Sequence, residues 1–334
     1  MTLRPPVVAD VADALAQLAG VAIRTPLLRS DELDALSGGK VFIKCENLQR
    51  SGAFKFRGAY NCLSRLDRAA FPGGVVAYST GNHGLAVAGV SRMLGLACTI
   101  VMPFDAPSVK IARARAHGAD IVLYDRHRQR REDIAASIAE RSAVAVVAPG
   151  DNPFVIAGQG TAMAEALQDL ALAGIAVDVA MVPCGGGGLA AGTCLAVEAL
   201  GFQTEVWAAE PAGFDDTRRS LASGKRECNA TVDGSICDAL LAPTPAALPF
   251  AVNKDRLARV EVADDDEVLD AMRFAYQELR IVLEPGGAVG LAALLARPGA
   301  LRGRTVVVVA SGGNVDTAVF MRALARQPIG GAAA

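Results

Sequence analysis

A lysine between two phenylalanines is the first residue in the chain whose type and setting suit covalent chemistry. Lys55 lies in the stretch SGAFKFRGA, residues 51–59, with Phe54 and Phe56 on either side. Apolar neighbours disfavour the charged form of an amine, which lowers its pKa and makes it a better nucleophile and base at neutral pH. The alternative is a surface lysine whose aliphatic stem packs on one of the rings. The stretch alone is compatible with both interpretations.

A run of four glycines forms the second candidate site. Gly185, Gly186, Gly187 and Gly188 lie in PCGGGGL, residues 183–189, after an expected strand and before an expected helix. Their N–H groups are unobstructed and can bind a phosphate at the positive end of the helix. A flexible turn is the alternative, but four glycines cost much backbone entropy, so we favour phosphate binding. The run is not a P-loop, because no Gly-Lys-Ser/Thr follows it.

The third candidate is a polar loop that follows another expected strand. In STGNHGLA, residues 79–86, Ser79, Thr80, Asn82 and His83 present hydroxyl, amide and imidazole groups within five positions. Such groups, together with the N–H groups of a following helix, suit a carboxylate. The same residue types also cap helices, and both roles are compatible.

The fourth candidate is ASGGNVD, residues 310–316, which follows the apolar run TVVVVA. Its Ser311 hydroxyl can bond to a ring atom of a ligand, and an ordinary turn is the alternative.

The elements that must position these loops alternate between short β-branched runs and helical patterns. This alternation predicts an α/β fold of open, twisted, mostly parallel sheets with helices on both faces. We expect a small mobile α/β domain over residues 73–151, a large domain from 1–72 and 152–330, and a ligand in the cleft between them. The expected strands are 74–79, 98–102, 120–124, 143–148, 177–184, 204–210 and 305–310, and the main expected helices are 82–95, 108–118, 131–142, 155–174, 189–201 and 264–280.

Composition excludes several functional classes. The 334 residues carry a formal net charge of only −2 and 5% aromatic residues, which argues against nucleic-acid binding. The apolar runs are too short to cross a membrane. Seven scattered cysteines without a CxxC pair, and only three histidines, argue against zinc and favour reduced thiols in the cytoplasm.

Taken together and in this order, the four motifs resemble those of the fold type II pyridoxal-phosphate (PLP) enzymes, which share the tryptophan synthase β-like fold. The threonine/serine dehydratase and serine racemase group is the most similar. A fifth stretch, LEPGGAVGLAAL at residues 283–294, is similar to the glutamate–proline segment that lies near the cofactor ring in that group. The resemblance covers nearly the whole chain, and it implies the same fold and cofactor.

The resemblance implies a role for each residue toward PLP. Lys55 would form the Schiff base with the cofactor aldehyde, and Phe54 would lie against the pyridine ring. Asn82 would bond to the ring hydroxyl, Glu284 would lie near the ring, and Ser311 would meet the ring nitrogen. A neutral serine leaves that nitrogen largely unprotonated, which favours loss of a β-substituent and limits transamination. The phosphate would be bound by Gly185, Gly186, Gly187, Gly188 and Leu189.

The resemblance also implies a reaction. Lys55 would act as the general base on the α-proton, and the loop carrying Ser79, Thr80, Asn82 and His83 would hold the substrate carboxylate. The expected reaction converts L-threonine or L-serine to a 2-oxo acid and ammonia. Arg131 resembles an arginine that reaches the substrate in the racemase branch.

Several alternatives stay open. A racemase needs an acid/base group on the face opposite Lys55, and that branch has serine where this chain departs from it with Thr80. Threonine keeps the hydroxyl but adds a methyl group, so a serine racemase is an alternative and not the first choice. A threo-3-hydroxyaspartate dehydratase is another, and its second carboxylate needs an added cation, for which His83 and Arg131 are candidates. STGNHG argues against a β-replacing synthase. Outside this class, the chain can be a non-catalytic α/β protein that binds a phosphate ligand through the glycine run. Such a protein would tolerate Lys55→Ala.

One acidic stretch resembles the divalent-cation site of the racemase branch. In AAEPAGFDD, residues 208–216, Glu210 and Asp216 would supply carboxylates and Phe214 its carbonyl. Oxygen ligands of this kind suit Mg²⁺, Ca²⁺ or Mn²⁺. An acidic turn that caps the next helix is the alternative. The resemblance further implies a homodimer.

Overall fold

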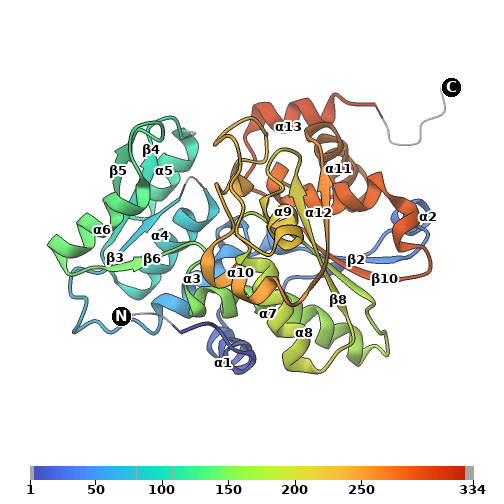
Figure 1. The fold of residues 1–334 in the computed structure, drawn as a ribbon, viewed down its shortest axis with the longest axis horizontal. Helices are drawn as coiled ribbons and strands as arrows, with labels where there is room; N and C mark the ends of the chain where they lie inside the picture. The colour runs from blue at the N-terminus through green and yellow to red at the C-terminus, as the bar shows by residue number, and fades with distance from the viewer. Residues whose placement is uncertain (1–3, 80, 107, 328–334) are drawn as a thin grey trace.

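Two mainly parallel sheets form the framework of the protein, each covered by helices on both faces (Figure 1). The computed structural model describes residues 4–79, 81–106 and 108–327. The expected α/β class, with open parallel sheets between helices, is confirmed.

The smaller sheet has four parallel strands in the order β5-β4-β3-β6. Its elements are β3 (Val75–Tyr78), α4 (Asn82–Leu94), β4 (Cys98–Pro103), α5 (Ser108–Ala116), β5 (Asp120–Tyr124), α6 (Arg131–Ser142) and β6 (Ala145–Val147). Helix α4 packs on one face, where Leu85 joins a buried cluster with Val75 and Ile100. Helix α6 covers the opposite face, where Ala135 packs with Val76.

The larger sheet has six strands in the order β1-β2-β10-β7-β8-β9, and only β1 is antiparallel to its neighbour. The strands are β1 (Leu27–Leu28), β2 (Lys40–Lys44), β7 (Val179–Pro183), β8 (Glu205–Pro211), β9 (Leu257–Ala263) and β10 (Thr305–Val309). The helices are α1 (Val8–Leu18), α2 (Asp31–Ser37), α3 (Lys55–Leu63), α7 (Pro153–Leu172), α8 (Gly188–Leu200), α9 (Asp216–Ser223), α10 (Ala247–Asn253), α11 (Asp265–Leu279), α12 (Pro285–Ala296) and α13 (Thr317–Leu324).

The core of the larger sheet follows the period of two that a strand imposes on its side chains. Val307 and Val309 of β10 belong to the cluster that includes α7 and α8, while Val306 and Val308 belong to the cluster with α11 and α12. A strand covered on both faces therefore has apolar residues throughout, as the run TVVVVA does.

Glycines allow helices α3, α7 and α8 to pack with their backbones almost in contact. A Cβ on Gly160 of α7 would lie 2.3 Å from the carbonyl oxygen of Gly192 in α8, and a Cβ on Gly158 would lie 2.7 Å from that of Arg57 in α3. No larger residue fits at these crossings. The packing fixes α3, which begins at Lys55, relative to α8, which begins at the end of the glycine run.

Strands β2 and β9 and helix α3 were not among the expected elements. Strand β2 is KVFIK, whose lysines do not predict a buried strand, yet Lys44 is fully buried against Glu165. Strand β9 is only partly buried and carries Arg259 on an exposed face. None of the helices in the described residues has the length and apolar character needed to cross a bilayer.

Candidate active site

The candidate residues lie on loops that leave the carboxyl ends of parallel strands, where α/β proteins bind ligands. The glycine loop, residues 185–188, follows β7, and Ser311 follows β10. Backbone contacts join the loop that carries Ser311 to the start of α3. The Phe54 N–H donates to the Ser311 carbonyl over 3.0 Å, and Ala53 pairs with Gly312 in an isolated antiparallel bridge. Lys55 and Ser311 are thus brought together from opposite ends of the chain.

Lys55 is the first residue of α3, and its side chain is half-buried. Its Nζ donates to the Pro149 carbonyl over 3.1 Å and lies 5.1 Å from the centroid of the Phe54 ring. Removal from water lowers the pKa of the Lys55 amine to about 8, because burial disfavours the charged form. An amine with this pKa is partly neutral at physiological pH and can act as a nucleophile and base.

The glycine loop forms the turn from β7 into α8, whose first residue is Gly188 and which no side chain caps. Gly187 has φ +88°, in the left-handed region that favours glycine, and a Cβ on Gly185 would lie 2.9 Å from the Cα of Leu240. The N–H groups from Gly185 to Leu189 have no acceptor among the described residues. Unpaired N–H groups at a helix N-terminus form an anion site, and they fit a phosphate.

Asn82, at the start of α4, links the two sheets. Its side-chain nitrogen donates to Oε1 of Glu284, and its oxygen accepts from Asn314 over 2.8 Å. Glu284 immediately precedes α12 without capping it through its side chain, and its backbone N–H donates to the Gly312 carbonyl. Its Oε2 is buried without a partner among the described residues, and burial raises the pKa of Glu284 to about 7. The unpaired oxygen leaves one hydrogen-bonding position of this carboxyl group unfilled.

The polar loop in which the sequence predicts substrate binding, called the substrate loop below, leads from the end of β3 into Asn82 and His83, the first residues of α4. The Ser79 hydroxyl accepts the Gly81 N–H over 3.1 Å, and Ser79 is buried. His83 is also buried, and its Nε2 donates to the Val147 carbonyl over 2.9 Å. Burial and the nearby positive charges lower the pKa of His83 to about 3, so its ring is neutral at physiological pH. Thr80 lies outside the described residues.

Arg131 begins α6 and lies beside this loop rather than inside it. Its guanidinium carbon is 5.4 Å from the centroid of the Tyr78 ring, and its Nε donates to Glu132 over 3.0 Å. Its positive charge contributes to the lowered pKa of His83, which places Arg131 near the loop. Its Nε is engaged by Glu132 rather than by the loop.

Glu210, Phe214 and Asp216 gather at the end of β8. They lie near the start of the glycine loop, because Cys184, which precedes Gly185, bonds to the Ala209 carbonyl and contacts the Thr217 hydroxyl. Both carboxylate oxygens of Glu210 accept backbone N–H groups, from Thr217 and Arg218, each over 2.9 Å. Oδ2 of Asp216 is buried without a partner among the described residues. Burial raises the pKa of Glu210 to about 8 and that of Asp216 to about 6. A cation beside these two buried carboxylates would favour their charged forms, so the pair fits a cation. No group of three or more His, Cys, Asp or Glu side chains suited to a metal occurs in the described residues.

The structure adds residues to the site that sequence reasoning missed. Arg57 is completely buried two positions after Lys55 and bonds to the carboxylates of Glu46 and Glu165. Asn314 bonds to Asn82, and Lys110 of α5 bonds to Asp238. These partners are far apart in the chain, so no local pattern in the sequence pointed to them.

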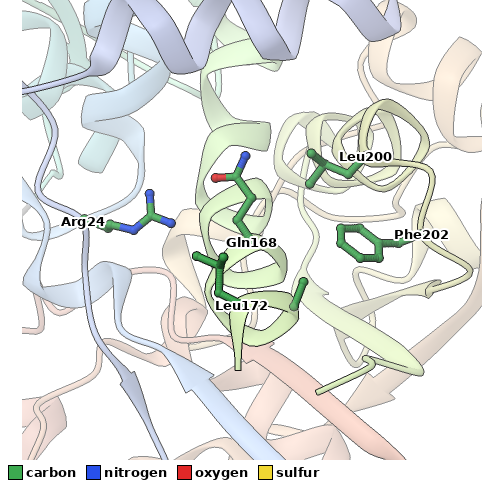
Figure 2. A pocket seen from close by; sticks show the side chains of 6 residues that line it. Arg24, Gln168, Leu172, Leu200 and Phe202 are labelled. Carbon is green, nitrogen blue, oxygen red and sulfur yellow. The ribbon is translucent and has the colours of Figure 1, made fainter. Parts of the chain in front are cut away.

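A shallow hollow lies elsewhere on the surface and shares no residue with the candidate site. Figure 2 shows it at the carboxyl ends of α7 and α8, where it is lined by Arg24, Gln168, Ala171, Leu172, Leu200 and Phe202. The glycine loop is at the opposite end of α8, so this hollow is not the active site.

The chain matches known proteins over most of its length. Residues 18–312 match the family model described as pyridoxal-phosphate dependent enzyme. The chain is 41% identical over 307 residues to an L-threo-3-hydroxyaspartate ammonia-lyase of Pseudomonas sp., and the match covers 92% of this chain and 95% of the relative. It is 35% identical over 307 residues to a serine racemase of Schizosaccharomyces pombe, covering 92% and 94%.

Solved structures agree with these matches. The structure of maize serine racemase superimposes with a TM-score of 0.89 at 34% identity, covering 96% of this chain and 97% of the other. The structure of a threonine deaminase from T.th. superimposes with a TM-score of 0.87 at 37% identity, covering 93% and 99%.

The site residues fit PLP. The cofactor aldehyde needs an amine that is partly neutral, as Lys55 is, and its phosphate needs the free N–H groups of the glycine loop. The open position at Glu284 Oε2 suits a polar atom on the ring. The motifs, the fold and the relatives lead to the same assignment. The chain belongs to the pyridoxal-phosphate dependent enzyme family, among its fold type II ammonia-lyases and racemases.

Proposed function

We propose that this protein is an ammonia-lyase that converts a β-hydroxy amino acid to a 2-oxo acid and ammonia. The observation that carries the proposal is that the half-buried Lys55 amine and the free N–H groups of the glycine loop lie at one site. Lys55 Nζ bonds to the Pro149 carbonyl, and a Cβ on Gly188 would lie 3.8 Å from the same oxygen. In this reaction the α-proton and the β-hydroxyl leave as water, and water then returns as ammonia is released.

Each residue of the site has a task in this proposal. PLP, when bound, withdraws electrons from the bonds at the α-carbon of the amino acid. Lys55 Nζ takes the α-proton, as an amine with a pKa near 8 can do. Ser79 and the N–H groups at the start of α4 hold the α-carboxylate, with Asn82 and His83 beside it.

Other residues set the environment of the cofactor. The N–H groups from Gly185 to Leu189 hold the phosphate, and Phe54 supplies an apolar wall beside Lys55. Ser311, buried at the end of β10, would face the ring nitrogen without a negative charge. Such a partner favours β-elimination over transamination.

Serine racemisation is the second candidate. It is supported by relatives named serine racemase, among them the protein from Dictyostelium discoideum, which is 35% identical over 318 residues. An acid/base group on the face opposite Lys55 is required, and we propose the hydroxyl of Thr80 for that position.

A divalent cation bound by Glu210, Asp216 and the Phe214 carbonyl is also proposed. It is supported by the unpaired buried oxygen of Asp216 and by the hard oxygen ligands. The homodimer that the resemblance implies is a further proposal, and light scattering of the purified protein tests it.

One assay tests the proposed function. Oxo-acid release and amino-acid inversion are measured with L-threonine, L-serine, D-serine and threo-3-hydroxyaspartate, each with Mg²⁺ and with a chelator. We expect oxo acid from at least one substrate with a β-hydroxyl. If no substrate gives oxo acid or inverted amino acid, the proposal is wrong. A colourless protein that binds no PLP would support the non-catalytic alternative instead.

A further inference from the structure

A buried cation lies at the edge of the substrate loop. Lys110 belongs to α5, beside the smaller sheet, and is buried. Its Nζ donates a short hydrogen bond to Oδ2 of Asp238. A Cβ on Gly81 would lie 3.5 Å from this nitrogen, so the ammonium group borders the backbone of the loop that is proposed to hold the substrate.

The partner of Lys110 comes from the opposite side of the site. Asp238 begins the short segment Asp238–Leu240, which packs against the glycine loop and the start of α12. A Cβ on Gly185 would lie 2.9 Å from Leu240 Cα, and one on Gly286 would lie 3.2 Å from Ala239 Cβ. Lys110 and Asp238 are also both near Glu284, since the charge of Lys110 lowers the pKa of Glu284 and that of Asp238 raises it. The pair therefore stands between the substrate loop and the glycine loop.

The two partners are buried to different degrees. The Lys110 side chain is 10% exposed, whereas that of Asp238 is 42% exposed. A buried ammonium group without a counter-ion is unfavourable, so Lys110 needs a carboxylate beside it. The half-exposed Asp238 can turn into solvent, so another carboxylate can replace it without leaving Lys110 unpaired.

We propose that Lys110 binds the side-chain carboxylate of an acidic β-hydroxy amino acid, of the 3-hydroxyaspartate class, and that Asp238 occupies this position until the substrate arrives. The inference rests on the proposed lyase function and names its substrate class. A substrate without a second carboxylate leaves Asp238 in place. Lys110 is then a specificity-determining residue.

The other cations near the loop suit this task less well. His83 is neutral at physiological pH, because burial lowers its pKa to about 3. Arg131 bonds to Glu132 and stacks over the Tyr78 ring. Among the described residues, the partner of Lys110 is the carboxylate of Asp238, which another carboxylate can replace.

The competing explanation is a latch: the pair would simply hold α5 against the larger sheet. The two explanations predict opposite effects of Asp238→Asn on the binding of the acidic substrate. If Lys110 binds the substrate, Lys110→Gln weakens binding of the acidic substrate, while Asp238→Asn removes a competing carboxylate and strengthens it. If the pair is a latch, both substitutions break the same contact and impair all substrates alike.

The test uses the PLP-loaded enzyme and steady-state kinetics with threo-3-hydroxyaspartate and L-threonine. For Lys110→Gln we expect kcat/KM for hydroxyaspartate to fall on the order of 100-fold more than for L-threonine, mainly through KM, since a buried charge pair is lost. Lys110→Arg should restore part of the preference. Asp238→Asn should lower KM for hydroxyaspartate. Arg115→Gln, which removes an exposed charge from the same helix, is the matched control.

The outcomes separate the inference from the proposed function. Equal losses for both substrates in Lys110→Gln, or a higher KM for hydroxyaspartate in Asp238→Asn, would overturn the role of Lys110 and leave the lyase assignment standing. A wild-type enzyme that turns over L-threonine but not hydroxyaspartate would also overturn it. A wild-type protein inactive on every β-hydroxy amino acid would instead contradict the proposed function.

Discussion

The side-chain amide of Asn82 donates to the carboxylate of Glu284, a residue 202 positions away in the chain. This bond crosses from the smaller sheet to the larger one. It links the start of α4, at the proposed substrate loop, with the start of α12. The other oxygen of Glu284 is buried and unpaired among the described residues. The protonation of this carboxyl group should therefore affect the stability of the protein.

Glu284→Gln should change how the stability of the PLP-free protein depends on pH. Burial raises the pKa of Glu284 in the fold to about 7, from an ordinary value of 4.5. Between these values the unfolded chain has lost the proton that the folded chain keeps, so wild-type stability falls as pH rises from about 4.5 to 7. Glutamine does not ionise, so the stability of the Glu284→Gln variant does not fall in this way as pH rises. Its melting temperature should exceed that of wild type by a margin that grows from pH 5 to pH 8, and a constant margin would contradict the raised pKa.

Gly187→Ala should weaken PLP binding more than Gly186→Ala. Gly187 has φ +88°, which costs an L-residue about 1–2 kcal/mol, and its Cβ would lie 2.9 Å from Asn253 Nδ2. The nearest atom to a Cβ on Gly186 is 3.8 Å away. Both variants keep their N–H groups, so the difference isolates backbone geometry. The dissociation constant for PLP, measured by absorbance titration, should rise about tenfold for Gly187→Ala. Equal effects at the two positions would argue against the strained turn.

Arg57→Met should destabilise the protein strongly. The completely buried guanidinium bonds to both Glu46 and Glu165, so among the described residues its removal leaves Glu46 without a counter-charge and Glu165 with Lys44 alone. Breaking a buried ion pair in this way costs about 3–5 kcal/mol. Arg24→Met, which breaks an exposed pair with Asp169, is the control and should cost less than about 1 kcal/mol. Urea denaturation measures the free energy of unfolding of both variants. Similar losses would show that the buried ion pairs stabilise the fold no more than the exposed pair does.

A divalent cation should raise the melting temperature of wild type but not of Asp216→Asn. The proposed ligands are the buried carboxylates of Glu210 and Asp216, and a cation that binds the folded state alone stabilises it by mass action. The carboxylates must lose their protons to bind it, so the effect of Mg²⁺ should be larger at pH 8.5 than at pH 6. Thermal unfolding with Mg²⁺ and with chelator measures this. Stabilisation of the variant as large as that of wild type would place the cation elsewhere.

Much of this architecture can be predicted from local sequence patterns. The strand–helix alternation from residue 75 onward predicts the smaller sheet, because short apolar strands and amphipathic helices differ in period. Asp264 caps α11 in a capping box with Glu267, and an acidic run at the start of an amphipathic pattern is the kind of signal that predicts such a cap. The glycine loop lies between strand and helix, as expected.

The remaining features depend on contacts between distant segments. Lys44 is part of a strand because Glu165, 121 positions away, neutralises its charge. Lys110 reaches Asp238 only after the two sheets come together, and charged residues in the sequence read equally well as surface groups. Sequence patterns identify the groups that perform chemistry more readily than the charges that surround them.

The central claim is that Lys55 carries the cofactor, and chemical trapping tests it most directly. The PLP-loaded protein is reduced with borohydride, digested, and mapped by mass spectrometry. The pyridoxyl group should be found on Lys55, and Lys55→Arg should lose both the label and the absorbance near the visible edge. A label on another lysine, or native turnover by Lys55→Arg, would contradict the account.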